Sequence, residues 1–261
     1  MLSKVIGFEM VTRDSILQFL DEYLEKSAFS DYLPIGLLVE GKPEVCKVAT
    51  GVSASAELFE SAVAWGADLI LVHHGMFWDS EERVVRGHIK RRLKTLLAAD
   101  VTLVGYHLPL DAHPEVGNNA LFAKGMGFLE PEPFIEYKGR KIGYRGKLPA
   151  VPFEEFVKRA SAFYGAEPKV TFACGKAEIT SCAVVSGGAW EHVLDTAQAG
   201  IDCYVTGSAD EPAYHLAREL GVHFLAFGHY CSERLGIMRL GELVAETFGV
   251  EARFFESENP L

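Results

Sequence analysis

The sequence predicts an α/β protein of two related α/β lobes with mixed, partly parallel sheets. Short apolar runs alternate along the chain with segments whose apolar residues recur at helical spacing. Such runs are typical of strands buried on both faces, which is the usual environment of parallel strands. One pattern occurs in both halves of the chain. It consists of residues 48–52, a helix and a strand beginning at 69 in the first half, and of residues 183–188, a helix and a strand beginning at 203 in the second half. Gly-x-Asp precedes the second strand in each half. We interpret the chain as a pseudo-duplicated pair of α/β units.

The first lobe is predicted to open with a helix. Thr12 is a good N-cap residue, Asp14 lies in the first turn, and the apolar residues that follow share one face. A turn-rich stretch then surrounds Pro34 and Gly36. Beyond it the elements alternate, with strands expected at 45–52, 69–72 and 101–106 and helices at 56–65 and 89–98.

The middle of the chain interrupts this alternation. Two strand-like segments, 134–137 and 141–144, flank Lys-Gly-Arg at 138–140, which predicts a β-hairpin. A helix is expected from Pro152, because proline is accepted in the first turn of a helix. The strand–helix alternation resumes at Ser181.

At 261 residues the chain is long enough for one large domain or two smaller ones. We assign residues 1–126 and about 235–261 to the first α/β lobe, and residues 127–234 to the second. Open α/β sheets bind ligands at the carboxyl ends of their strands. We therefore expect a metal site in the cleft between the lobes.

Composition limits the possible partners. The net charge of −11 argues against nucleic-acid binding, which needs an excess of Lys and Arg, but not against a small phosphorylated ligand held through a metal. No apolar run is long enough to span a bilayer, and residues 1–9 lack the layout of a signal peptide, so we expect a cytoplasmic protein. The five scattered cysteines indicate reduced thiols rather than disulfides.

The first candidate site residues, His73 and His74, follow a buried strand. Side chains alternate across a strand, so both imidazoles point one way only where the chain leaves the sheet, which Gly75 permits. Each imidazole could bind a metal ion, or one could bind while the other orients a neighbour. An isolated His-His pair is more typical of hydrogen-bonded core histidines, so this signal depends on further ligands.

Two other clusters supply those ligands. His107, Asp111 and His113 lie in a proline-containing loop after another strand, where Asp111 is a candidate ligand for one ion or for two. His107 and His113 are candidate ligands, outer-shell partners or catalytic acid–base groups, and loop capping is the alternative, above all for His113. His229 and Glu233 are four residues apart, so a helix beginning near His229 places both on one face, with helix capping as the alternative.

The chemistry of this set favours a transition metal. Cys231 lies two positions from both His229 and Glu233, so it points to another side and is left out. Three histidines and two carboxylates without a thiolate suit zinc, iron, manganese or nickel. Glu233 is the natural bridge if two ions are bound.

Three sequence runs resemble the GTP cyclohydrolase type 2 homologue family, the Ngg-interacting-factor-three-like, dinuclear-metal hexameric proteins. They are VEGKPEVCKVATGVSASAELFESAVAWGADLILVHHGMFW, YHLPLDAHPEVGNNALFAKGMG and FGHYCSERLG. The resemblance covers nearly the whole chain, in the short form without a large central insertion. It implies two related lobes, a toroidal homohexamer and a two-metal site.

Carried over residue by residue, the resemblance implies that His74 and Asp111 bind one ion, His73 and His229 bind the other, and Glu233 bridges them. Ser208 is a departure, because many relatives have an acidic residue just after the corresponding glycine. This position is not among the five ligands, so the resemblance still implies metal binding, with a different substrate preference.

Two functions remain open at this point. The first is a metal-dependent, cyclohydrolase-like hydrolase acting on a small nucleotide-like or cyclic-amide substrate, with His107 or His113 as acid–base group. The chain has no Walker loop and no dinucleotide fingerprint, so nucleotide recognition is an analogy. The second is a non-enzymatic metal-storing, metal-delivering or regulatory interaction protein.

Overall fold

The computed structural model describes residues 11–82 and 84–261 of the chain. Residues 1–9, which were expected to lack the layout of a signal peptide, lie outside the described part of the chain. Within the described part, none of the helices is long and apolar enough to cross a membrane.

The described chain forms two compact units. Unit 1 comprises residues 11–27, 32–106 and 240–255, and unit 2 comprises residues 28–31, 107–239 and 256–261. The sequence pattern assigned 107–126 to the first lobe, whereas the structure places this segment in unit 2. The physical reason is packing, because the two helices of this segment lie on strands of the second sheet.

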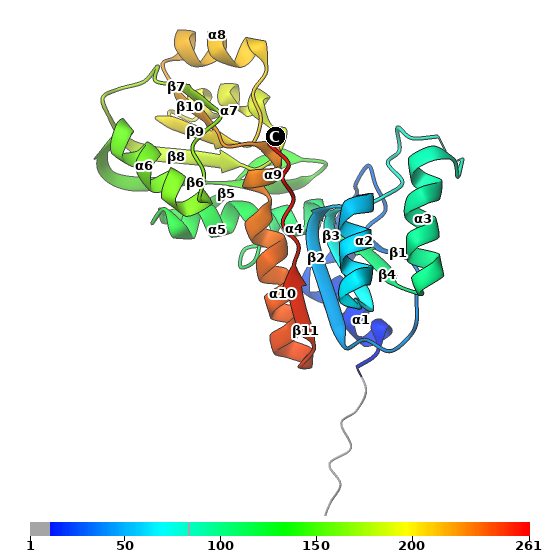
Figure 1. The fold of residues 1–261 in the computed structure, drawn as a ribbon. Helices are drawn as coiled ribbons and strands as arrows, with labels where there is room; N and C mark the ends of the chain where they lie inside the picture. Colours follow the sequence, from blue (N-terminus) through cyan, green and yellow to red (C-terminus); the bar gives the residue numbers. More distant parts are fainter. Residues whose placement is uncertain (1–10, 83) are drawn as a thin grey trace, which may run out of the picture. The chain divides into compact units, whose positions relative to one another are not determined.

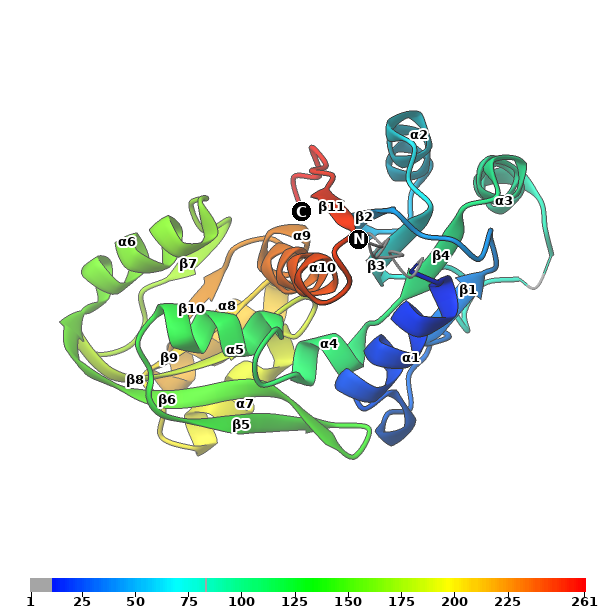
Figure 2. The ribbon, with the colours of Figure 1, turned by 90° about the horizontal axis from the view of Figure 1, so that it is seen from below.

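Unit 1 is built on a five-stranded sheet in the order β1-β4-β3-β2-β11, in which only β1 is antiparallel to its neighbour. Its elements are α1 (Arg13–Tyr23), β1 (Gly36–Val39), β2 (Lys47–Ser53), α2 (Ala56–Trp65), β3 (Leu69–His74), α3 (Gly87–Ala99), β4 (Thr102–Gly105) and β11 (Glu251–Phe254). A short 3-10 helix, η1 (Lys26–Ala28), follows α1, and the last part of α10 (Arg234–Phe248) also belongs here. Figure 2 shows α2 and α3 on one face of the sheet, where their apolar residues share a buried cluster with the strands.

The predicted elements of unit 1 are confirmed, but two strands, β1 and β11, were not predicted. Thr12 caps α1 as expected, its hydroxyl accepting a hydrogen bond from the Ser15 amide at 3.1 Å. The turn-rich stretch around Gly36 contains β1, a strand of four residues that pairs with β4. So short a strand beside a proline carries too little periodicity to be recognised.

Unit 2 is built on a six-stranded sheet in the order β5-β6-β8-β9-β10-β7, in which β8, β9 and β10 are parallel. Its elements are α4 (Leu108–Ala112), α5 (Asn118–Gly125), β5 (Leu129–Tyr137), β6 (Arg140–Pro152), α6 (Phe153–Tyr164), β7 (Val170–Phe172), β8 (Glu178–Val185), η2 (Trp190–His192), α7 (Val193–Gln198), β9 (Cys203–Thr206), α8 (Glu211–Leu220), β10 (His223–Ala226) and α9 (His229–Ser232). Figure 1 shows α5 and α6 on one face of this sheet and α7 and α8 on the other. The predicted hairpin is confirmed as β5 and β6, which are longer than expected.

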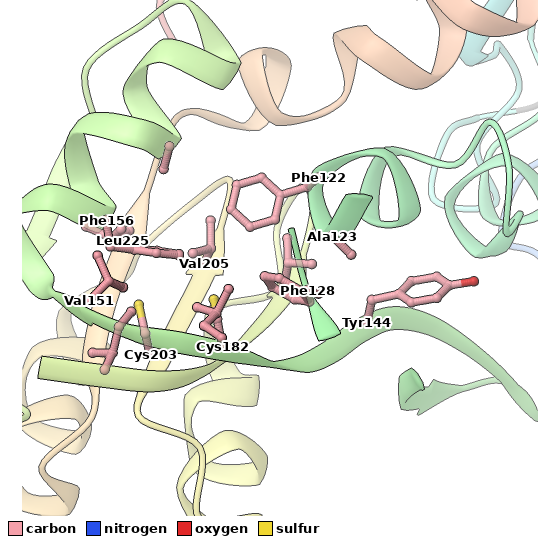
Figure 3. Packing of buried hydrophobic residues seen from close by; sticks show 14 of the residues in the cluster. Phe122, Ala123, Phe128, Tyr144, Val151, Phe156, Cys182, Cys203, Val205 and Leu225 are labelled. Atoms are coloured by element: carbon pink, nitrogen blue, oxygen red, sulfur yellow. The ribbon is translucent and has the colours of Figure 1, made fainter. Parts of the chain in front are cut away.

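The core of unit 2 explains why residues 107–126 belong to it. Phe122 and Ala123 of α5 pack with residues of β6, β8, β9 and β10 in one buried cluster (Figure 3). Phe122 is fully buried there, against Phe128 and Tyr164. Removing α5 from the second sheet would expose this apolar surface, so the unit boundary falls before α4.

The two units share one topology, which confirms two related lobes. In unit 1 the chain runs α1-β1-β2-α2-β3-α3-β4, and in unit 2 it runs α6-β7-β8-α7-β9-α8-β10. The corresponding strands have the same order, β1-β4-β3-β2 and β7-β10-β9-β8, and the first strand of each set is the antiparallel one. His107 follows the last parallel strand of the first set, and His229 follows that of the second.

Candidate metal centre

In unit 1, β3 ends with two histidines whose rings lie side by side. The ring centroids of His73 and His74 are 4.6 Å apart, with 45° between the ring planes. Sequence reasoning expected the chain to leave the sheet for this to happen, but His74 is still part of β3 and pairs with Ser53 of β2. The two rings therefore come together at the last ladder position of the strand.

Each of these rings is held through its Nδ1 atom. Nδ1 of the buried His73 lies 3.2 Å from the carbonyl oxygen of Tyr106. A carbonyl only accepts, so Nδ1 carries the proton and Nε2 of the neutral ring carries the lone pair that can bind a metal. Nδ1 of His74 contacts the Ser53 hydroxyl at 3.0 Å, and the indole of Trp78 lies beside the same imidazole, 5.9 Å between centroids.

In unit 2, His229 and Glu233 form a close pair. His229 lies in α9, Glu233 is its C-terminal cap, and Nε2 of the histidine is 3.2 Å from Oε2 of the glutamate. The Glu233 side chain is 3% exposed and that of His229 is 41% exposed. The spacing of four residues thus brings these two side chains close together.

Asp111 joins this pair within unit 2. A carboxylate oxygen of Asp111 and one of Glu233 lie within 4.8 Å of each other. Asp111 is buried in α4, where its Oδ1 accepts hydrogen bonds from the Asn118 amide at 3.0 Å and from the Ser186 hydroxyl at 3.1 Å. Within unit 2, Glu233 therefore lies close both to an imidazole and to a second carboxylate.

A glycine makes room for Glu233. A Cβ atom at Gly187 would lie 2.3 Å from Oε1 of Glu233 and 3.2 Å from Nε2 of His229, and Gly187 has a φ of +71°. Only glycine fits such a position without strain. The pair of glycines after β8 was visible in the sequence, but its proximity to Glu233 was not.

The two histidines proposed as acid–base groups have different surroundings. Nδ1 of His107 contacts the fully buried carboxylate of Asp31 at 3.0 and 3.1 Å, and Asp31 also accepts the Leu108 amide at 3.1 Å. Nδ1 of His113 accepts the amides of residues 115 and 116 at 3.2 and 3.3 Å. His113 therefore makes the loop-capping contacts considered as its alternative, while His107 has the carboxylate partner that orients a reactive imidazole.

Asp31 was missed by sequence reasoning. It precedes His107 by 76 residues, and no local spacing connects them. Cys231, which was left out of the site, packs against the buried cluster of unit 2, and burial raises the pKa of its thiol. A thiol held protonated in an apolar environment is a poor metal ligand.

The donor atoms fit a divalent transition metal. Unit 1 offers two imidazoles, and unit 2 offers the imidazoles of His107 and His229 with the carboxylates of Asp111 and Glu233. Nitrogen and oxygen donors without thiolate suit zinc, iron, manganese and nickel. The histidine and carboxylate clusters of this protein could therefore bind metal ions.

Known proteins share this sequence over nearly its full length. The chain is 40% identical to the GTP cyclohydrolase 1 type 2 homolog of Pseudomonas aeruginosa over 252 residues, covering 96% of this chain and 99% of the relative. It is 42% identical to the GTP cyclohydrolase 1 type 2 homolog of Escherichia coli over 247 residues, covering 93% and 97%.

Solved structures agree with these relatives. The chain is similar to protein ybgI, described as of unknown function, with a TM-score of 0.90, 40% identity and coverage of 96% and 100%. It is also similar to TTHA1606 from Thermus thermophilus, with a TM-score of 0.86, 32% identity and coverage of 96% and 100%. The sequence profile of the Duf34/NIF3 (NGG1p interacting factor 3) family matches residues 11–260, and the chain belongs to this family.

Proposed function

We propose that this protein binds two divalent metal ions and uses them to hydrolyse a small nucleotide-like or cyclic-amide substrate. His74 and Asp111 are the ligands proposed for one ion, His73 and His229 those for the other, and Glu233 is proposed to bridge them. The proposal is carried by the grouping of three side chains. Nε2 of His229 lies 3.2 Å from Oε2 of Glu233, and a carboxylate oxygen of Asp111 lies within 4.8 Å of one of Glu233. Buried carboxylates that converge in this way repel one another unless a cation or protons neutralise them.

The chemistry of such a site would be hydrolytic. Two bound divalent ions would supply Lewis acidity that activates water near neutral pH and stabilises negative charge on the substrate. His107, oriented by Asp31, is the acid–base group we would examine before His113, whose Nδ1 already accepts two backbone amides. The name of the relatives, GTP cyclohydrolase 1 type 2 homolog, supports a nucleotide-like substrate by analogy.

Metal content is the first test. Protein purified without added metal is analysed for bound elements and then titrated with Zn²⁺ and Mn²⁺, and about two ions per chain are expected. His229→Ala should lower this number, because it removes a ligand. No bound transition metal, together with no uptake on titration, would refute the metal site.

The chain contains a matched control for this experiment. His215 and Glu211 are also four residues apart on a helix, and Nε2 of His215 lies 3.1 Å from the carboxylate. Both side chains are largely exposed, 60% and 78%, and in the described part of the chain neither belongs to a group of three such ligands. His215→Ala should therefore leave the metal content unchanged.

Turnover is the second test. Metal-loaded protein is incubated with a panel of nucleotides and cyclic amides, and hydrolysis of one class is expected. Glu233→Gln should abolish it, because the proposed bridging charge is lost while the shape is kept. If no compound is hydrolysed while the bound metal exchanges readily with other proteins, a storage or delivery role replaces the hydrolase.

Self-association is a separate expectation. We propose a homohexamer, on the resemblance to the hexameric family. Light scattering on the purified protein measures the mass directly, and a monomer or dimer at micromolar concentration would contradict this assembly.

A further inference from the structure

Asn118 ties the carboxylate of Asp111 to the start of α10. Its Nδ2 donates to Oδ1 of Asp111 at 3.0 Å, and its Oδ1 accepts the amide of Gly236 at 2.7 Å. The two contacts fix the orientation of the Asn118 amide, because Gly236 N–H can only donate and the Asp111 carboxylate can only accept. Gly236 lies three residues after Glu233 in the sequence, so Asn118 connects the segments that carry two of the proposed ligands.

Ser186 makes the second contact to the same oxygen. Its hydroxyl donates to Oδ1 of Asp111 at 3.1 Å, and its backbone amide donates to Oδ1 of Asn119 at 2.7 Å. Asn119 in turn donates to the carbonyl of Ile142 in β6 at 2.8 Å. The position of Ser186 is thus fixed by its own hydrogen bonds, and it does not depend on Asp111.

All four polar side chains of this network are buried. Asn118 is 2% exposed, Asn119 1%, Asp111 6% and Ser186 8%. α10 approaches closely because residue 236 is a glycine, since a Cβ atom there would lie 2.7 Å from Oδ1 of Asn118. Asn118 and Ser186, from different segments, both donate to Oδ1 of Asp111. These two bonds restrict rotation of the carboxylate group. Neither bond involves Oδ2.

We propose that Asn118 and Ser186 are positioning residues that hold the Asp111 carboxylate in the orientation needed to bind a metal ion. This inference rests on the proposed function, in which Asp111 is a ligand. Hydrogen bonds to a ligating carboxylate restrict its rotation before the metal arrives, and losing such an outer partner typically weakens metal binding by about 10- to 100-fold. Asn118 and Ser186 themselves do not contact the ion.

Two variants of Ser186 whose side chains are isosteric with each other test the inference. Thr and Val have nearly the same shape, but only Thr keeps the hydroxyl that donates to Asp111. Zn²⁺ affinity is measured by competition with a chromophoric chelator, and the visible spectrum of bound Co²⁺ reports the ligand geometry. Ser186→Val should weaken Zn²⁺ binding by about 10- to 100-fold and alter the Co²⁺ spectrum, whereas Ser186→Thr should stay close to wild type. Asn118→Ala should resemble Ser186→Val.

Ser161 provides the control for a merely structural effect. Its hydroxyl also donates to a carboxylate at 3.1 Å, that of Glu167, and it is also 8% exposed. Ser161→Ala should lower the melting temperature of the metal-free protein and leave Zn²⁺ affinity unchanged.

The outcomes separate the inference from the proposed function. If wild-type protein binds no Zn²⁺, the proposed function fails. If wild type binds Zn²⁺ while Ser186→Val and Asn118→Ala bind it equally well, the positioning role is refuted and the metal site stands. Equal losses in Ser186→Thr and Ser186→Val would also overturn the inference, because side-chain volume and not the hydroxyl would then be responsible.

Discussion

Asp202 holds the same place in the second sheet that Asp68 holds in the first. The carbonyl of Asp68 accepts the amide of Thr102, the first residue of β4, and the carbonyl of Asp202 accepts the amide of His223, the first residue of β10, both at 3.0 Å. The carboxylate of Asp68 accepts the amides of residues 46 and 47 at 2.7 and 2.9 Å, and that of Asp202 accepts the Thr180 amide at 2.8 Å. In each unit one aspartate therefore joins the beginnings of three parallel strands.

Replacing either aspartate by asparagine should destabilise the protein. Hydrogen bonds accepted by a buried carboxylate contribute about 1.5–3 kcal/mol, so Asp68→Asn and Asp202→Asn should each lower the free energy of unfolding by an amount of this order. Urea unfolding at pH 7 measures it. Glu155→Gln, which removes only an exposed pair with Arg159, is the control and should change stability by less than about 1 kcal/mol.

The pH dependence of this effect has a definite sign. Burial raises the pKa of the Asp68 and Asp202 carboxyls, but the hydrogen bonds they accept lower it by more, so both pKa values lie below the ordinary one. Their stabilisation is therefore complete above the unfolded pKa of about 4 and is lost as the pH falls through the folded pKa. The difference between wild type and Asp202→Asn should shrink at pH 3, and an unchanged difference would contradict this account.

His223 should make the protein less stable in mild acid. Its ring stacks on Phe153 at 3.8 Å, its Nε2 lies 2.6 Å from the Lys176 carbonyl and its Nδ1 accepts the Gly175 amide at 3.4 Å, so the neutral ring is satisfied at both nitrogens. Burial lowers its pKa, and contacts with Lys176 and Asp202 oppose this only partly. The unfolded chain therefore binds a proton near pH 6.5 that the folded chain resists, and stability falls as the pH drops below that value.

The measurement compares wild type with His223→Phe between pH 7 and pH 5. The variant keeps the stacked ring and lacks the titrating group, so its free energy of unfolding should depend less on pH. His215→Phe, a change at an exposed histidine, should leave the wild-type dependence intact. Parallel curves for wild type and His223→Phe would count against a role for this residue.

The fold was predictable where its signals are local. Thr12 and Ser55 cap their helices through amides three residues ahead, and the apolar runs of the central strands are contiguous. The boundary between the units was not predictable in this way. The pattern of α5 reveals an apolar face containing Phe122, but periodicity does not say which sheet covers that face.

In the candidate site too, contacts between residues that are close in sequence were predictable and contacts between distant residues were not. His73 with His74, and His229 with Glu233, are neighbours in sequence. Each pair alone was ambiguous, and only the combination of these pairs with Asp111 predicted a site. The partners that orient the site come from far away along the chain, as Asp31 does for His107 and Ser186 for Asp111. Tertiary folding creates these contacts, and a single sequence carries no local signal of them.

Asp31 should determine which nitrogen of His107 carries the proton. A carboxylate only accepts, so Asp31 requires a proton on Nδ1 and makes Nε2 the lone-pair atom of the neutral ring. Asp31→Asn can present an amide N–H instead, which favours the opposite tautomer. Two-bond ¹⁵N–¹H spectra of the histidine rings distinguish the tautomers. Asp195→Asn, at the exposed pair with His192, should leave the His107 signals unchanged, and a His107 tautomer that survives Asp31→Asn would contradict this role.

Gly187→Ala should impair metal binding more than it impairs folding. The new Cβ atom would meet Oε1 of Glu233 at 2.3 Å, and because this is the end of a flexible side chain, Glu233 is expected to move while the backbone stays. The positive φ adds about 1–2 kcal/mol of strain. Gly200→Ala is the matched control, since Gly200 has a φ of +70° and a methyl group there would meet nothing within 4 Å. Both variants should lose similar stability in urea, but only Gly187→Ala should lose Zn²⁺ affinity, by about tenfold or more, because it displaces a proposed ligand. Equal Zn²⁺ affinities in the two variants would show that the position of Glu233 does not matter for binding.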